Sequence, residues 1–346
     1  MRGLGIFIAI FLCWSEFALA NSCPQILRDF SVFHFPTGLG GRARGAKLAP
    51  AALKEAGLYE KLNADGLKFE TPYEIAIEDF SNPAEFIEPP SGQPGPSAIN
   101  HKEILLPALK DLRDRNLAAL RAGKIPLNIG GDHSLEMAPL AAISLLGAER
   151  NQTINEIRFD AHPDFHTPRS SHSKNLHGMT LAHALRLADS DVDFLELFSP
   201  KVDEGQKILM IGIRDIDLGE WHLLDQLRRS QPKRISFFEP ERVNQLGIEN
   251  VMDQMIEAAT MNGQKFHFSF DLDGIDPSIA PGVGTRVNHG LSLNDARYVA
   301  DRIFAESQKG NVTSMDAVEL DPHRDPNGAS TKIMIEIISR LTTGRP

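Results

Sequence analysis

Cysteine is scarce in this chain of 346 residues, which contains only Cys13 and Cys23. Residues 4–14 form an almost continuously apolar run, and Ala18-Leu19-Ala20 has the small-x-small form of a signal-peptidase site. We therefore predict a signal peptide over residues 1–20. Because only Cys23 would remain after cleavage, an intramolecular disulfide is excluded even in an oxidising compartment.

The predicted signal peptide implies export, either to the periplasm or to the medium. The mature protein would then be a single domain over residues 21–346. Lipidation at Cys23 is a less favoured alternative, because the residues before it, Ala20-Asn21-Ser22, match the lipobox poorly. Beyond the N-terminal run, no segment of the sequence is apolar enough over the length that a membrane span requires.

Concentrated positive charge is also missing. Lys and Arg total 36 against 46 Asp and Glu, which gives a formal net charge of -10. Because contacts with nucleic-acid phosphates require a basic surface, the sequence disfavours a nucleic-acid partner. Internal repeats and low-complexity tracts are not found, and a hydrophobic content of 42% is ample for one large packed domain.

Short apolar segments alternate with longer helical ones along the chain. Strands are predicted at residues 29–35, 73–77, 125–129, 156–159, 207–212, 235–238, 266–270 and 315–320. Helices are predicted at residues 50–55, 102–122, 176–187, 221–228, 248–261, 294–306 and 332–341. Several of these strands are apolar enough to be buried on both faces. The alternation predicts an α/β fold with a mainly parallel sheet that is covered on both faces.

Three features refine these helix predictions. Pro107 is expected to kink or break the helix at residues 102–122. The pairs Asn100 with Glu103 and Ser292 with Asp295 resemble N-terminal caps of the helices that follow them.

Three aspartate-rich segments directly follow predicted strands. They are Gly130-Gly131-Asp132-His133-Ser134, Asp160-Ala161-His162-Pro163-Asp164, and the segment 269–277, Ser-Phe-Asp-Leu-Asp-Gly-Ile-Asp-Pro. Ligands of parallel sheets bind beyond the carboxyl ends of the strands, where all three segments are expected to lie. The two glycines before His133 allow a tight turn and a close approach of the backbone.

Alternation along an extended chain carries Asp160, His162 and Asp164 to one side, and it does the same for Asp271 and Asp273. Two unit charges ~4 Å apart interact by about 4 kcal/mol at an effective dielectric of ~20, so four carboxylates cannot share a pocket without protons or cations. Oxygen ligands with added imidazoles suit divalent metals such as manganese. One such segment alone is more often a turn or a helix cap, but the three together predict a two-metal hydrolytic site.

In order and flanking sequence, these segments resemble the ureohydrolase family, most closely the arginases. The resemblance extends from about residue 35 to about residue 341 and includes the segments 281–285 and 318–322. It implies one three-layer αβα domain with a sheet of about eight strands, two Mn²⁺ per chain, and a homotrimer or homohexamer. It assigns one Mn²⁺ to His133, Asp160, Asp164 and Asp271, and the other to His162, Asp160, Asp271 and Asp273.

The resemblance also implies the hydrolysis of a small guanidino substrate, L-arginine, to ornithine and urea. Asp164 would carry a proton to the departing amine, His177 would shuttle protons, and Glu319 would pair with the guanidinium. The implied substrate contacts are Ser173, Asn175 and His166 for the α-carboxylate, Asp217 and Glu220 for the α-amino group, and Thr285 in support of Glu319. Asp217 and Glu220 have an alternative role at the start of a helix, where acids favour the dipole.

Three positions depart from the arginase pattern. His166 replaces a usual asparagine, Lys174 a usual glycine and Arg286 a usual proline. Agmatine lacks the carboxylate that Ser173 and Asn175 would bind, so these residues favour arginase over agmatinase. Other guanidino or formimino acids remain open as substrates. A zinc deacetylase of related fold and a non-catalytic metal-binding relative are less favoured alternatives.

Overall fold

A computed structural model describes residues 28–88, 98–187, 189–199, 203 and 205–346. The predicted signal peptide and Cys23 lie outside the described residues, so export and lipidation stay predictions. Among the helices of the described ranges, none combines the length and the apolar character that crossing a membrane requires.

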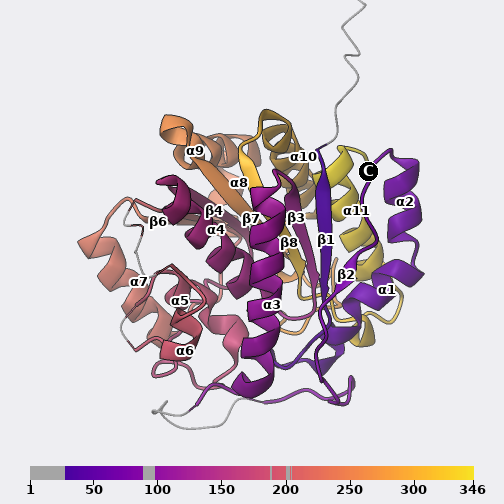
Figure 1. Cartoon of the computed structure of the whole chain (residues 1–346), viewed down its shortest axis with the longest axis horizontal. Coiled ribbons are helices and arrows are strands. Elements are labelled where there is room, and N and C mark those ends of the chain that lie inside the picture. Colours follow the sequence, from indigo (N-terminus) through magenta and orange to yellow (C-terminus); the bar gives the residue numbers. More distant parts are fainter. Residues whose placement is uncertain (1–27, 89–97, 188, 200–202, 204) are drawn as a thin grey trace, which may run out of the picture.

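Eight parallel strands form one sheet through the middle of the molecule (Figure 1), in the order β2-β1-β3-β8-β7-β4-β5-β6. The strands are β1 (Phe30–Phe35), β2 (Tyr73–Glu74), β3 (Ile125–Gly130), β4 (Ile154–Phe159), β5 (Ile208–Ile211), β6 (Ile235–Phe238), β7 (Lys265–Asp271) and β8 (Val312–Val318). Each predicted strand is confirmed, with boundaries that differ by a few residues. The predicted α/β class is also confirmed.

Helices cover both faces of this sheet (Figure 1). One layer packs on the core that holds Phe268 and Phe270, and it consists of α1 (Ala49–Glu55), α2 (Leu58–Ala64), α8 (Pro240–Leu246), α9 (Ile248–Thr260), α10 (Leu293–Lys309) and α11 (Ala329–Thr343). The other packs on a second core, and it consists of α3 (Lys102–Arg121), α4 (Met137–Arg150), α5 (Thr180–Ala184), α6 (Val192–Leu195) and α7 (Leu218–Ser230). The fold is therefore a single three-layer αβα domain.

Packing inside the sheet fixes the strand ends that carry the aspartate-rich segments. Strands β4 and β7 are neighbours in register, with Phe159 opposite Phe270. The two rings stack with their centroids 4.9 Å apart, and both side chains are fully buried. Such an aromatic pair adds about 0.5–1.5 kcal/mol beyond the burial of its area. Asp160, which follows β4, and Asp271, the last residue of β7, therefore lie side by side where these strands end.

The structure differs from the sequence-based expectations in several helices. Four helices, α2, α4, α6 and α8, were not predicted. Helix α4 is buried on all sides over its first seven residues, Met137–Ile143, so its sequence lacks the polar face that reveals a helix. The predicted helix at residues 176–187 is a 3₁₀ turn, Leu176–Met179, followed by the short α5.

The structure contradicts two local expectations for helix α3, a break at Pro107 and a cap at Asn100. The helix runs through Pro107 without a break. Both Pro107 and Glu103, whose carbonyl loses its helical donor, are exposed, so water can satisfy that carbonyl. Asn100 does not cap the helix. Its side-chain amide donates instead to Ser173 O and Asn175 Oδ1, both at 2.9 Å.

The predicted cap of α10 is confirmed as a full capping box, in which Ser292 Oγ accepts from Asp295 N and the Asp295 carboxylate accepts from Ser292 N. We expect Ser292→Ala to lower the free energy of unfolding by about 1 kcal/mol, because a backbone donor of the first turn loses its partner. Chemical denaturation measures the change. Ser230→Ala, an exposed serine at the last position of α7, is the control and should change stability by less than about 0.5 kcal/mol. An equal loss in both variants would contradict the assignment.

Candidate metal and substrate site

The aspartate-rich segments converge at the carboxyl edge of four adjacent strands, β3, β8, β7 and β4. The segments follow β3, β4 and β7, and Glu319 follows β8. A cavity of about 150 Å³ opens there. Its lining includes the predicted residues His133, His162, Asp164, His166, Ser173, His177, Asp217, Glu220, Asp271, Asp273, Thr285 and Glu319. Asp160 lies fully buried beside this lining, and Asn175 is not part of it.

The first cluster surrounds the imidazole of His133. Its Nδ1 lies 3.2 Å from Asp160 Oδ2, 3.2 Å from Asp164 Oδ2 and 3.0 Å from Asp271 Oδ2. Its Nε2 lies 2.9 Å from Ser269 Oγ. Nδ1 is buried and has no hydrogen-bond partner. A histidine bonded through one nitrogen and turned with the other toward three carboxylate oxygens has the arrangement of a metal ligand.

The second cluster surrounds His162. Its Nδ1 lies 3.1 Å from Asp273 Oδ2 and 3.6 Å from Asp160 Oδ1. Asp160 thus has one oxygen in each cluster and links the two. Asp271 turns Oδ2 toward His133, while its Oδ1 accepts from Asp273 N at 2.8 Å. The six predicted ligands therefore form one continuous group of imidazoles and carboxylates.

Burial makes this group electrostatically demanding. It raises the pKa of Asp271, and the neighbouring Asp273 and Asp160 raise it further. Burial also raises the pKa of Asp273, with repulsion from Asp160 acting in the same direction. Carboxyl groups in such surroundings need protons or cations to be stable. The buried, unpartnered His133 Nδ1 and the all-oxygen-and-nitrogen donor set fit two hard or borderline divalent ions.

Glu319 and His177 form a pair next to the backbone of His133. Glu319 Oε1 accepts from the backbone N–H of His133 at 2.8 Å and lies 3.1 Å from His177 Nδ1. Burial by itself would lower the pKa of His177, but the hydrogen bond and the charge of Glu319 outweigh it and raise that pKa. The chain before His133 packs tightly against the backbone at Thr37, since a Cβ at Gly131 would lie 1.8 Å from the carbonyl oxygen of Thr37.

Asp217 has two roles at the far end of the cavity. Its Oδ1 accepts from Gly219 N at 2.7 Å and from Glu220 N at 3.0 Å, so it caps helix α7. Its Oδ2 lies 3.1 Å from His166 Nε2. Burial would raise the pKa of Asp217, but the bond and charge of His166 lower it to about 2. One oxygen of this carboxylate therefore caps the helix, and the other contacts His166.

The remaining predicted contacts differ in their surroundings. Thr285 Oγ1 is buried, without a hydrogen-bond partner, in the cavity lining. Ser173 also lines the cavity, and its Oγ accepts from Asn175 N at 3.2 Å. The side chain of Asn175 accepts from Asn100 and belongs to the loop behind the lining. Arg286 bonds to the carbonyl oxygens of Pro281 and Arg324, outside the lining.

Two charged residues beneath the site were not predicted from the sequence. Arg158 Nη1 lies 2.9 Å from Asp164 Oδ2, and Arg158 Nη2 donates to Glu136. The sequence contained a signal for Arg158, because a charged residue two positions before Asp160 stands in a strand predicted to be buried. Glu136 gave no such signal, since it stands in a turn and its buried position follows from the packing of α4.

Comparison with known proteins agrees with this geometry. The family model described as Arginase family matches residues 28–343. The chain belongs to the arginase family. It is 32% identical to an arginase from Emericella nidulans over 85% of this chain and 87% of that one. It is 30% identical to an arginase from Bacillus caldovelox over 91% and 98% of the two chains. The solved structure of the Bacillus caldovelox arginase superposes with a TM-score of 0.76, at 26% identity and the same coverage.

Membership of this family makes the chain a hydrolase of C–N bonds in amidines, and the predicted resemblance is confirmed. The family consists of binuclear metal enzymes, which agrees with the two linked clusters around His133 and His162. Family membership and the geometry of the site therefore both support arginase-type hydrolysis by this chain.

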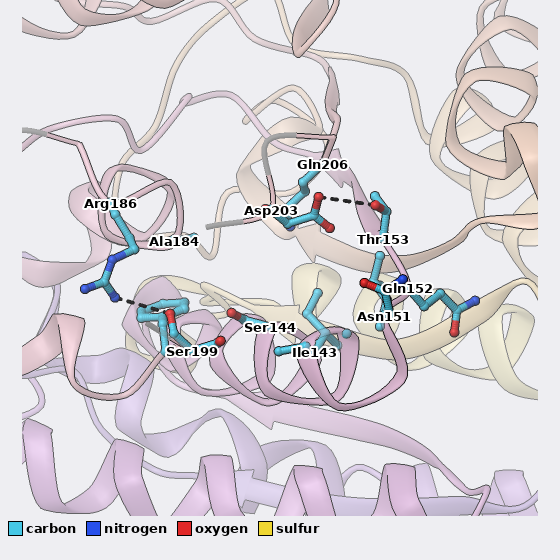
Figure 2. A pocket seen from close by; sticks show the side chains of 14 residues that line it. Ile143, Ser144, Asn151, Gln152, Thr153, Ala184, Arg186, Ser199, Asp203 and Gln206 are labelled. Atoms are coloured by element: carbon cyan, nitrogen blue, oxygen red, sulfur yellow. Dashed lines mark hydrogen bonds between the residues drawn. The ribbon is translucent and has the colours of Figure 1, made fainter. Parts of the chain in front are cut away.

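A larger cavity, of about 320 Å³, lies at the other end of strand β4, between its first residues and the end of α4 (Figure 2). Asp203 bonds there to Thr153 Oγ1 at 3.2 Å, and Arg186 Nη1 bonds to Ser199 O at 3.4 Å. Among the described residues of its lining there is no histidine, and the one carboxylate is that of Asp203. The smaller cavity at the carboxyl edge is therefore the candidate site.

Glu220 provides a test of burial in the candidate site. Burial raises its pKa from 4.5 to about 7. The folded state therefore binds more protons than the unfolded state between these pH values, so the contribution of Glu220 to stability falls as the pH rises from 4.5 to about 7. A glutamine at this position would keep an acceptor for Phe165 N but has no charge to bury. We expect Glu220→Gln to exceed wild type in unfolding free energy by about 1–3 kcal/mol near pH 8, and by almost nothing near pH 4.5.

Urea denaturation at the two pH values measures this difference. Glu249→Gln, at an exposed position in the first turn of α9, is the matched control. A stability difference that does not change with pH would contradict the expected cost of ionising Glu220.

Proposed function

We propose that the chain is a binuclear manganese hydrolase that cleaves the guanidinium group of L-arginine to ornithine and urea. The observation that supports it most is the convergence of two imidazoles and four carboxylates around one cavity that also contains Glu319. Export of the protein and a trimeric or hexameric assembly remain proposals from the sequence.

In this proposal, His133, Asp160, Asp164 and Asp271 hold one ion, and His162, Asp160, Asp271 and Asp273 hold the other. When bound, two divalent ions supply Lewis-acid activation of water and neutralise the four carboxylates. The distances between the histidine nitrogens and the carboxylate oxygens support this division. For Asp160, the two oxygens already face different histidines.

Glu319 is proposed to bind the guanidinium. Its Oε1 is held by His133 N and faces His177. Its Oε2 faces Gly284, where a Cβ would lie only 3.1 Å from that oxygen. A glycine there leaves room beside the carboxylate, and Thr285 Oγ1 next to it can accept a guanidinium N–H. A charge-assisted hydrogen bond to a buried carboxylate is among the stronger contacts that a substrate can make.

Proton transfer is assigned to Asp164 and His177. Asp164 is close to fully buried and lies at the edge of the first cluster, where it can pass a proton to a departing amine. His177 lines the cavity, and its pKa is raised by Glu319, so it can hold a proton near neutral pH. Glu319 thus orients both the substrate and the proton carrier.

The other end of the substrate is proposed to meet Ser173 and His166 through its carboxylate and Asp217 and Glu220 through its ammonium. Asn175 would act from behind, because its backbone N–H bonds to Ser173 Oγ and its side chain to Asn100. Lys174 Nζ bonds to Pro168 O at 2.5 Å, which supports a role in shaping this loop.

One observation favours a second candidate. His166 lies between Asp217 at 3.1 Å and Glu220 at 3.9 Å, where the ammonium of arginine would bind. If this imidazole keeps its place when the substrate binds, the cavity suits a guanidino acid without an α-amino group, such as guanidinobutyrate. The chemistry at the metal end would be unchanged.

For the main proposal, we expect Glu319→Gln to lower kcat/KM for urea release from L-arginine by at least about 100-fold, because a buried charge pair with the guanidinium is lost. Manganese-loaded wild type and variant are compared by urea detection, with elemental analysis to show that both keep two ions per chain. Glu249→Gln is the control and should match wild type. Wild type that holds two ions but releases no urea from any guanidino compound would refute the proposal.

For the second candidate, Asp217→Asn is the informative change, because asparagine still caps a helix but cannot neutralise an ammonium. If Asp217 binds the α-amino group, kcat/KM should fall at least about tenfold with arginine and stay nearly unchanged with guanidinobutyrate. Agmatine, which lacks the carboxylate, should be a poor substrate for both proteins. A wild type that prefers guanidinobutyrate, and a variant equally active on arginine, would favour the second candidate.

A further inference from the structure

Arg158 is a fully buried cation directly beneath the candidate metal site. It stands on β4 two residues before Asp160, so its side chain leaves the strand on the same face. A guanidinium stays charged at every accessible pH, so its burial requires fixed negative partners. The identity of those partners determines what Arg158 does.

The partners of Arg158 lie on two sides. On the side away from the cavity, Nη2 donates to Glu136 and to Thr180 Oγ1, and Nε lies 3.3 Å from Glu156 Oε1. On the cavity side, Nη1 lies 2.9 Å from Asp164 Oδ2 and 3.3 Å from Asp160 Oδ2. One guanidinium therefore joins an internal pair of glutamates to two proposed metal ligands.

The same two carboxylate oxygens also face the first cluster. Asp160 Oδ2 and Asp164 Oδ2 each lie 3.2 Å from His133 Nδ1. A carboxylate oxygen has two lone pairs, so each of these oxygens can turn one toward the ion side and the other toward Arg158. The oxygens proposed to bind an ion are thus already shared with a permanent cation.

We propose that Arg158 is a built-in counter-ion of the metal centre and a positioning residue for Asp160 and Asp164. It stabilises the metal-free protein by offsetting part of the carboxylate charge, and it weakens the binding of the divalent ion on the His133 side. This inference rests on the proposed two-metal site. The inference adds to that site a cation of the chain itself, Arg158, which sets how tightly the divalent ion on the His133 side is held.

The competing explanation is that Arg158 only neutralises Glu136 and packs the interior. The two explanations differ in one respect. A purely structural arginine contributes equally to stability with and without metal. A counter-ion contributes more without metal, because bound ions take over its task. The difference in metal-induced stabilisation between variant and wild type therefore separates the two.

The test is Arg158→Met, studied by thermal unfolding in EDTA and in saturating Mn²⁺, and by calorimetric titration with Mn²⁺ alone. We expect the midpoint to fall much more in EDTA than in Mn²⁺, and the tighter Mn²⁺ dissociation constant to decrease at least about tenfold. A tenfold change corresponds to about 1.4 kcal/mol of added stabilisation by the ion at saturation. Glu156→Gln is the matched control, since Glu156 lies 3.3 Å from the same guanidinium but has no ion pair or hydrogen bond with a proposed ligand, and it should leave the Mn²⁺ affinity nearly unchanged.

A second variant covers the case in which Arg158→Met does not fold under either condition. Arg158→Met/Glu136→Leu removes both members of the buried ion pair between Arg158 and Glu136, and apolar replacement of such a pair is often tolerated. It should also bind Mn²⁺ at least severalfold more tightly than wild type. Unchanged or weaker Mn²⁺ binding in whichever variant folds would overturn the inference. Wild type that binds no divalent ion would instead overturn the proposed function, so the two failures are distinguishable.

Discussion

Repulsion among four buried carboxylates is the constraint on which the site depends. Asp160, Asp164, Asp271 and Asp273 are each less than a tenth exposed, and burial strengthens every interaction between their charges. The domain holds them together through its sheet. Two of them directly extend the neighbouring strands that the stacked rings of Phe159 and Phe270 lock in register. The packing of the core thus holds like charges close together, and bound cations would neutralise them.

Much of this arrangement was predictable, because its signals are local. Several of the eight strands are short runs rich in apolar residues, and the aspartate-rich segments come at the ends of three strands, so a parallel sheet brings them to one edge. Ser292 and its cap were predictable for the same reason. What was not predictable depends on distant packing. Helix α4 is apolar on every side at its start. Asn100 does not cap α3 as predicted, because its side chain donates to Ser173 and Asn175.

The charges next to the site show the same limit. Arg158 alternates with apolar residues in a buried strand, but only the fold shows that its guanidinium bonds to Glu136 on one side and to Asp164 on the other. The pairing of His166 with Asp217 joins residues that are distant in the sequence. The residue types along the chain can single out such residues. Their partners, however, are set by the three-dimensional arrangement of the loops.

The division of labour within Asp217 bears on how substrate choice can change in this site. Its Oδ1 caps α7 whatever occupies the cavity, so the start of the helix stays ordered. Its Oδ2 faces His166 and can exchange that partner for an ammonium without loss of the cap. If Asp217 binds the ammonium as proposed, exchange of its His166 partner changes substrate selection at this end while the cap of α7 is kept.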